Sequence, residues 1–184
     1  MKILWNFDRL KEKIRRWYRK EVFKEKIACP HSDFTIVGEI TLINRNITLG
    51  HNVTIYPDVM FFGDGPIIIG NNVSIGNGTV IYASNTDGGV TIGNDTQIAA
   101  QCYIIDMDHG TRDDELIRNQ SNSVSPVFIG TDVWLSAGCI VLKGSIIHDG
   151  AIIGASSLVK GEIPQKTIAI GIPAKAIKKR VAKK

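Results

Sequence analysis

The segment that decides the fold runs from Ile129 to Val159 and reads IGTDVWLSAGCIVLKGSIIHDGAIIGASSLV. Counting from its first residue in steps of six reaches an aliphatic side chain every time, at Ile129, Leu135, Val141, Ile147, Ile153 and Val159. The residue four places after each of them is small or β-branched. A period of six matches neither the period of an α-helix, about 3.6 residues, nor the two-residue alternation of a plain strand. It predicts a short strand and a tight turn, repeated many times, with each aliphatic side chain pointing inward.

The same period recurs upstream, where short insertions shift its phase. The aliphatic or aromatic positions form four further runs: Ile36 and Leu42; Leu49, Ile55 and Phe61; Ile69, Ile75 and Ile81; Ile92, Ile98 and Ile104. Stacked turns of this kind bury a continuous apolar column, as in β-solenoids. Glycine often follows the aliphatic residue, and we expect it to supply a turn conformation that a Cβ would disfavour, at Gly50, Gly70, Gly76, Gly93, Gly130 and Gly154. Cys102 and Cys139 fall in the small inward slot, so we interpret them as packing residues.

This pattern resembles the hexapeptide-repeat acyltransferases over roughly residues 34–175. The resemblance implies an all-β fold, a left-handed parallel β-helix, and the handedness comes from the family rather than from the spacing. We expect an N-terminal basic helix at 1–27, a catalytic β-helix at 28–165 with a loop at 110–128, and a C-terminal basic tail at 166–184.

Length and composition agree with a single domain. The chain has 184 residues, rich in Gly and poor in aromatic side chains, which suggests many short strands and turns. No stretch approaches the roughly 18 apolar residues of a membrane span, and the N-terminus is too charged for a signal peptide. The three cysteines are widely spaced and lack metal-ligand spacing, so we expect reduced thiols, no metal and a cytoplasmic protein.

The net charge of +4 is unevenly distributed. Residues 1–26 contain ten Lys or Arg and four Asp or Glu, and residues 175–184 contain six basic residues and no acid. The rest of the chain is acidic. Basic ends on an acidic body argue against a nucleic-acid partner, which would require one continuous basic surface. They favour an anionic ligand, a membrane surface or a partner subunit.

Residues 2–26 are predicted to form an amphipathic helix. Its apolar residues alternate steps of four and three and make one stripe, at Ile3, Phe7, Leu10, Ile14 and Trp17. We expect this helix to pack on its own domain or on neighbouring subunits. The alternative is a basic amphipathic helix that lies on an anionic membrane surface and makes the protein peripheral to the membrane.

The repeat is interrupted after IIDMDHG, which begins at Ile104. Ile104 is in phase with the residues before it, and the next residue in phase is Ile129. Residues 110–128 are therefore predicted to leave the solenoid as a loop, with His109 at a corner where side chains point outward. Because most connections are short, an excursion of this length indicates a role.

The resemblance implies that His109 is the general base, which takes the proton from the acceptor while the acceptor attacks acetyl-CoA. An imidazole suits this step because its pKa lies near neutrality. One of Asp106 and Asp108 could orient His109 or bind the acceptor, and the sequence does not choose between them. We expect the acceptor pocket around the 82–89 insertion, with Tyr82 and Asn85, and the 110–128 loop.

Other residues correspond to the coenzyme A site of the family. The resemblance places Trp134 beside the acyl-transfer site and the backbone of Ala137 and Ala155 along the pantetheine arm. It places three lysines against the adenosine end and phosphates of coenzyme A, at Lys160, Lys175 and Lys178. Their charge suits an anionic ligand on an otherwise acidic body. The family further implies acetyl-CoA as co-substrate and a homotrimer with the site between subunits.

Three function classes follow. The first is an O-acetyltransferase acting on a saccharide hydroxyl in bacterial surface-polysaccharide synthesis. The second is an N-acetyltransferase acting on a nucleotide-linked amino sugar, and the third is a non-catalytic structural β-helix. The γ-type carbonic anhydrases share the fold, but they need three histidines of which two are close in sequence, and here no two are close.

Overall fold

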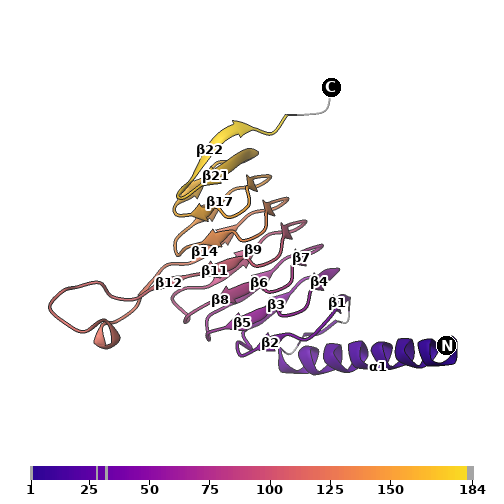
Figure 1. Cartoon of the computed structure of the whole chain (residues 1–184). Coiled ribbons are helices and arrows are strands. Elements are labelled where there is room, and N and C mark those ends of the chain that lie inside the picture. Colours follow the sequence, from indigo (N-terminus) through magenta and orange to yellow (C-terminus); the bar gives the residue numbers. More distant parts are fainter. Residues whose placement is uncertain (1, 28, 32, 182–184) are drawn as a thin grey trace.

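The computed structural model describes residues 2–27, 29–31 and 33–181, with side chains from residue 9 onward. Its backbone winds through three parallel sheets in turn and forms a left-handed β-helix (Figure 1). We call the sheets A, B and C, in the order in which each coil visits them. The solenoid predicted from the six-residue period and the left-handed β-helix implied by the family resemblance are both confirmed.

The strands are short because each occupies one side of a coil. Sheet A contains β1 (Phe34–Ile36), β4 (Val53–Ile55), β7 (Ser74–Ile75), β10 (Gln97–Ile98), β15 (Trp134–Leu135), β18 (Ile152–Ile153), β21 (Thr167–Gly171) and β22 (Ala174–Lys179). Sheet B contains β2 (Thr41–Leu42), β5 (Met60–Phe62), β8 (Val80–Tyr82), β11 (Tyr103–Ile105), β16 (Ile140–Val141) and β19 (Leu158–Val159). Sheet C contains β3 (Ile47–Leu49), β6 (Ile67–Ile69), β9 (Val90–Ile92), β14 (Val127–Ile129), β17 (Ile146–Ile147) and β20 (Glu162–Ile163).

The core is a set of aliphatic columns that run along the solenoid. In sheet A the strand register aligns inward residues from successive coils, and all are buried: Ile36, Ile55, Ile75, Ile98, Leu135 and Ile153. Cys102 and Cys139 are also buried, as their place in the repeat predicts. A hydrogen bond with the side chain of Cys139, together with burial, raises the pKa of the Cys102 thiol well above its usual range.

The repeat glycines serve close approach between coils rather than turn conformation. None of the six glycines that follow an in-phase aliphatic residue has a positive φ, so the expectation that they supply a turn conformation is wrong. A Cβ on Gly50 would lie 2.5 Å from the backbone carbon of Gly70, one coil further on. The left-handed conformation falls two residues after Gly50 and Gly70 instead, at Asn52 and Asn72. Their side chains hydrogen-bond at 3.0 Å, and Asn72 donates to Asp95 at 2.8 Å. Asparagine tolerates this conformation because its short polar side chain bonds locally.

The helix α1 (Lys2–Lys26) lies across the first coils and extends past them (Figure 1). Phe23 and Ile27 close that end of the core, with the Phe23 ring 5.7 Å from Phe34 and 6.3 Å from Phe61. The predicted stripe does not pack on its own chain, since its described members Leu10, Ile14 and Trp17 are exposed; Ile3 and Phe7 lie outside the described side chains. Within the described residues, no helix is both long and apolar enough to cross a bilayer.

At the other end, β22 pairs antiparallel with β21 and ends sheet A. The segment that we expected as a basic tail, 166–184, therefore begins with a strand of the solenoid. Between β11 and β14 the chain leaves the coil as a hairpin of β12 (Met107–Asp108) and β13 (Ser123–Val124), with a short 3-10 helix η1 (Ile117–Asn119) in its loop (Figure 1). Val127 and Phe128, expected in the loop, already belong to β14.

Candidate active site

Each candidate residue can be placed on the three-sided solenoid by the sheets that flank it. A coil passes from sheet A to B and then to C, and so has an AB corner, a BC corner and a CA corner. The hairpin leaves at a BC corner. His109 follows β12 directly and is exposed at the base of the hairpin. Within the described part of the chain it makes no hydrogen bond or ion pair, so neither ring nitrogen is engaged by another group of the protein.

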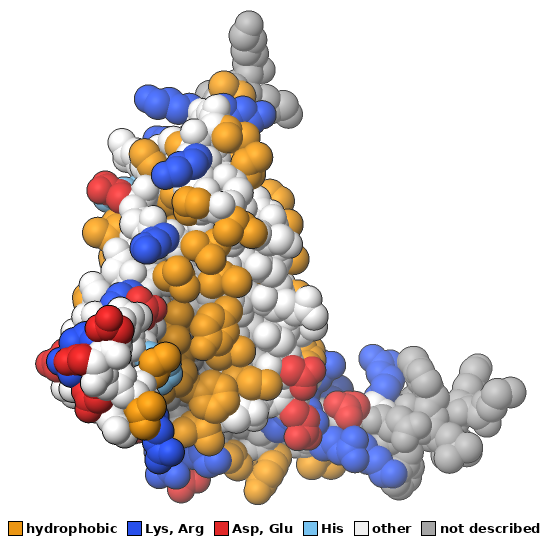
Figure 2. Space-filling model, turned by 60° about the vertical axis from the view of Figure 1, so that its left-hand side comes forward, with side chains coloured by type: hydrophobic (Ala, Val, Ile, Leu, Met, Phe, Trp, Pro, Cys, Tyr) orange, Lys and Arg blue, Asp and Glu red, His pale blue; other side chains and the backbone are white. Residues whose placement is uncertain are grey.

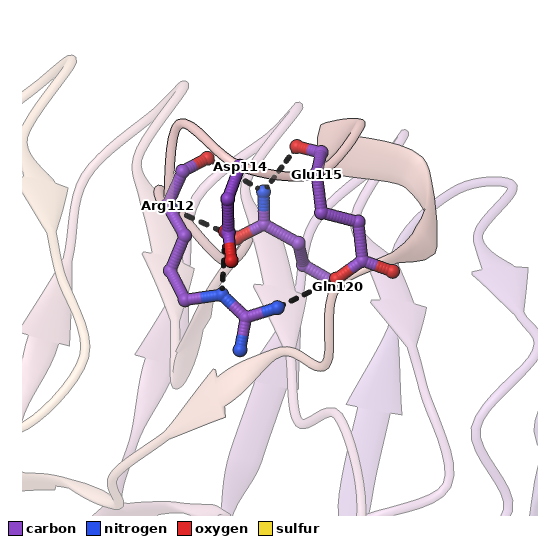
Figure 3. A network of polar contacts seen from close by, with 4 residues as sticks. All are labelled: Arg112, Asp114, Glu115 and Gln120. Carbon is purple, nitrogen blue, oxygen red and sulfur yellow. Dashed lines mark hydrogen bonds and ion pairs between the residues drawn. The ribbon is translucent and has the colours of Figure 1, made fainter.

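The loop above His109 is braced by its own polar side chains (Figure 3). The Arg112 guanidinium donates to Asp114 at 3.1 Å and to Glu115 at 2.7 Å. Gln120 donates to the carbonyl oxygens of Arg112 and Glu115, both at 2.8 Å, and accepts from the Arg112 N–H at 2.9 Å. These hydrogen bonds connect the two sides of the loop and give this polar segment a defined shape.

A lysine from a later coil fixes the base of the hairpin. The Lys143 Nζ lies 3.2 Å from a carboxylate oxygen of Asp108, and donates to the Ser123 hydroxyl at 2.6 Å and its carbonyl at 3.3 Å. Asp108 and Ser123 face each other across β12 and β13. The Lys143 side chain is only 24% exposed, so it is held in this position. Lys143 is not among the site residues predicted from the sequence, although its place two residues after the in-phase Val141 puts it at a BC corner.

Asp106 has a different environment from Asp108. Its side chain is completely buried, and its oxygens accept from the N–H of Ser84 at 2.8 and 3.0 Å and from that of Gly89 at 2.7 Å. A Cβ on Gly88 would lie 2.1 Å from one of these oxygens, so a glycine is required there. Asp106 therefore holds the 82–89 insertion in place from within, through Ser84 and Gly89, and does not face the solvent.

Two further acceptor candidates, Tyr82 and Asn85, belong to the 82–89 insertion. Tyr82 is half-buried at the end of β8 and stacks on Phe62, with ring centroids 6.3 Å apart. Burial, and to a smaller extent the neighbouring Tyr82, raises the pKa of Tyr103 on the next strand of sheet B. Asn85 is exposed, but its side-chain oxygen accepts from the N–H of Asp87 at 2.9 Å and thus shapes the turn.

The outer face of sheet B is apolar. The strand register aligns outward side chains of successive coils in two columns. The longer column comes from five coils and contains Met60, Val80, Tyr103, Ile140 and Leu158. The shorter column beside it contains Phe62, Tyr82 and Ile105. Figure 2 shows this band of hydrophobic side chains next to the projecting loop. Tyr103 and Ile140 are each 37% exposed. We call this surface face B.

Trp134 and the two alanines proposed for coenzyme A lie on another side of the solenoid. Trp134 is 49% exposed on the outer side of sheet A, where it lines a groove of about 280 Å³ with Tyr56, Gln97 and Ala99. Ala137 and Ala155 lie at successive AB corners, and the Ala137 carbonyl accepts from the N–H of Ser156 at 2.9 Å.

The three candidate lysines do not cluster in one chain. Lys175 and Lys178 are exposed on β22, at the end of sheet A. Lys160 is exposed at a BC corner, on the same edge as His109 and Lys143. One chain thus brings together His109, Asp108 and the 82–89 insertion at its BC edge. It carries Trp134, Ala137 and Ala155 on sheet A and the AB edge.

The other histidines have structural partners. His31 and His51 are one coil apart and stack at 4.2 Å, so two histidines distant in sequence do lie close in the fold. His31 contacts the Leu49 carbonyl at 2.9 Å, and His51 lies 3.4 Å from the Asp33 carboxylate. His148 pairs with Glu162 at 2.6 Å. Across the described residues, no three His, Cys, Asp or Glu side chains are grouped so that they could hold a metal ion.

Comparison with known proteins gives the family. The model of the bacterial transferase hexapeptide (six repeats) matches residues 126–161. The dTDP-4-amino-4,6-dideoxy-D-glucose acyltransferase of Escherichia coli is 35% identical over 162 residues, which cover 74% of this chain and 83% of that protein. The chain belongs to the hexapeptide-repeat acyltransferase family.

Two further proteins to which the chain is similar are informative. WbbJ of Escherichia coli (strain K12), named for O-acetyl transfer in lipopolysaccharide biosynthesis, is 40% identical over 126 residues, or 64% of this chain. The match covers 63% of WbbJ, so this chain spans less than two thirds of that relative's length. A single-site variant of AntD, an N-acyltransferase from Bacillus cereus in complex with dTDP-4-amino-4,6-dideoxyglucose and coenzyme A, has a TM-score of 0.74 at 21% identity, with 89% of this chain and 90% of that chain covered.

Proposed function

We propose that this protein is an O-acetyltransferase that transfers an acetyl group from acetyl-CoA to a hydroxyl of a saccharide, in the synthesis of a bacterial surface polysaccharide. The observation that carries the proposal is His109, an exposed imidazole at the base of a braced polar loop. The name of WbbJ supports a hydroxyl acceptor and a surface polysaccharide.

In the proposed reaction His109 acts as general base. It removes the proton from the acceptor hydroxyl while that oxygen attacks the thioester carbonyl of acetyl-CoA. The C–S bond then breaks, the acetyl group stays on the acceptor oxygen, and the imidazolium returns the proton to the coenzyme A thiolate. Lys143 and Asp108 position the hairpin from which His109 projects.

We propose that the complete site forms between subunits of a homotrimer. His109 belongs to the BC edge, whereas Trp134, Ala137 and Ala155 belong to sheet A and the AB edge, so one chain does not bring them together. A neighbour that presents its sheet A to this BC edge would unite them. Face B supports such packing, because a continuous apolar surface beside a polar site favours a protein partner.

For acetyl-CoA we propose backbone contacts at Ala137 and Ala155 and phosphate contacts from Lys160, Lys175 and Lys178. All three lysines are exposed and free to approach an anion. Charge reversal by Lys175→Glu should raise the KM for acetyl-CoA more than it lowers kcat. The non-catalytic alternative makes a different prediction, because a structural β-helix would gain no thermal stability from coenzyme A.

The acceptor class is tested directly with purified protein, acetyl-CoA and two acceptor panels, with release of the coenzyme A thiol as readout. One panel contains saccharides with free hydroxyls, and the other contains nucleotide-linked amino sugars. We expect turnover with the first panel. Turnover with the second panel alone would establish the N-acetyltransferase alternative, which the dTDP-amino-sugar acyltransferase relative and AntD favour.

A further inference from the structure

The outer side of α1 carries an apolar stripe that nothing described in this chain covers. Leu10, Ile14 and Trp17 are 54%, 56% and 63% exposed. They follow one another at steps of four and three, and therefore share one side of the helix. Tyr18, at the edge of this stripe, is 63% exposed and lines a groove with Ile40 and Leu42 of the first coil. Large aromatic and aliphatic side chains at such exposure indicate a surface with a partner.

The direction in which this stripe points limits which surfaces could cover it. Ile14 and Phe23 are nine residues apart, which is about two and a half helical turns, so they lie on opposite sides of α1. Phe23 points into the end of the solenoid core, where it contacts Phe34 and Phe61. The helix lies at the first-coil end of the molecule (Figure 1). Because the stripe is on the side of the helix opposite Phe23, it points away from the coils. Subunits packed side by side with parallel axes do not cover a face with this direction.

Charge identifies the kind of surface. Residues 9–26 contain nine Lys or Arg and three Asp or Glu. Lys13 and Arg15 adjoin Ile14 in sequence and lie about 100° to either side of it around the helix, so cations border the stripe on both edges. Arg15 also pairs with Glu12 at 3.2 Å, and Glu21, two turns after Ile14, lies in line with the stripe, so the excess of positive charge belongs to its edges. A second copy of this helix would bring like charges together. An anionic lipid surface accepts both the apolar stripe and the cations, whose alkyl stems extend toward the headgroups.

We propose that this side of α1 binds the surface of a bilayer that contains anionic phospholipids, with the helix lying flat in the interface. The solenoid then stands on the membrane with its first coil nearest the lipid. This inference depends on α1 and the solenoid end, and it holds whichever acceptor the active site uses.

The test is co-sedimentation of the full chain with vesicles of phosphatidylcholine alone or of phosphatidylcholine mixed with phosphatidylglycerol. We expect at least tenfold tighter binding to the mixed vesicles, weakened by added salt because screening reduces the charge attraction. The double variant Ile14→Glu/Trp17→Glu should lose at least tenfold in binding while keeping its circular dichroism spectrum. The matched control is Leu116→Glu/Ile117→Glu, which changes two side chains of similar exposure, 68% and 60%, in the hairpin loop and should bind as the parent does.

Several results would overturn the proposal. The parent could remain in the supernatant with both kinds of vesicle, or bind both equally. The two double variants could lose binding to the same degree, which would assign the effect to net charge rather than to α1. The parent could also fail to bind vesicles but have twice the mass of the Ile14→Glu/Trp17→Glu variant. That result would mean that the stripe binds a second copy of the assembly instead of a membrane.

Discussion

Asp106 and Asp108 stand two residues apart, yet the structure gives them unrelated surroundings. Asp106 is the last residue of its coil side and turns inward, where its carboxylate accepts from two N–H groups, those of Ser84 and Gly89. Asp108 lies on β12, after the chain has left the coil, and pairs with Lys143 at the surface. Strand alternation predicts that both share one face, and it fails here because the backbone changes direction between them.

The catalytic assignment predicts a large effect at one histidine. His109→Ala should lower turnover by roughly 10²- to 10⁴-fold, the usual contribution of a general base, while thermal stabilisation by coenzyme A persists. His148→Ala is the control, since it removes an imidazole from a CA corner and should leave turnover unchanged. Steady-state thiol release measures both. Near-normal turnover in the first variant would show that another group accepts the proton.

The buried carboxylate predicts a stability effect. Asp106→Asn would turn one acceptor oxygen into an NH₂ group facing N–H donors, and should cost about 1–3 kcal/mol in the free energy of unfolding. The exposed Asp108→Asn should change that free energy by less than about 0.5 kcal/mol. Urea unfolding at one protein concentration compares them, and equal midpoints would mean that the hydrogen bonds of Asp106 contribute little.

Among the elements, the β12–β13 hairpin depends most on its connection to the solenoid. Its two strands pair only with each other, and Lys143 fastens their base to the following coil. Lys143→Met should lower kcat about ten- to a hundredfold with little change in the KM for acetyl-CoA, because misplacing His109 affects chemistry more than binding. Lys143→Arg, which keeps the charge, should recover most of the loss. A rise in KM alone would place Lys143 in the coenzyme A site instead.

The sequence predicts the solenoid elements well and the site only in part. A six-residue period determines which side chains point inward, because each coil repeats the same geometry on its neighbours. It also locates His109 at a corner, since the phase breaks after Ile104 and resumes at Ile129. It does not reveal contacts between neighbouring coils, such as the stacking of His31 on His51, 20 residues apart, or the Lys143–Asp108 pair, 35 residues apart. Those contacts depend on where insertions shift one coil against the next.

The helix α1 shows the same limit. Its periodicity identifies an apolar stripe, but not the partner of that stripe. Phe23, which closes the core, lies on the opposite side and carries no periodic signal of its own. A single buried ring at the end of a solenoid has no repeat to mark it, so only the three-dimensional structure shows that α1 is fastened by its last turns.

For the whole molecule, face B predicts self-association. In the proposed trimer its apolar columns are buried, and Tyr103→Glu/Ile140→Glu would place two charges in that contact. We expect the variant to lose both trimeric mass and turnover, and to keep its circular dichroism spectrum, because both side chains point away from the core. Tyr103→Phe/Ile140→Val, which leaves the face apolar, should remain trimeric.

Light scattering at low micromolar concentration measures this directly. A parent of monomeric mass with full activity would overturn both the trimer and the shared site. If the Tyr103→Glu/Ile140→Glu variant stayed trimeric, the subunit contact would have to lie on a face other than face B. A different subunit arrangement would then be needed to bring His109 close to Trp134.

The antiparallel pairing of β22 with β21 affects whether solenoids of separate molecules can stack end to end. A parallel stack offers, at its last coil, strands whose unpaired N–H and C=O groups can template a further chain, and so could lengthen into a filament. β22 occupies this edge of sheet A in the opposite direction and carries Lys175, Lys178 and Lys179. A chain arriving in the parallel register would meet a reversed, positively charged strand, and polymerisation through this sheet would stop at the first molecule.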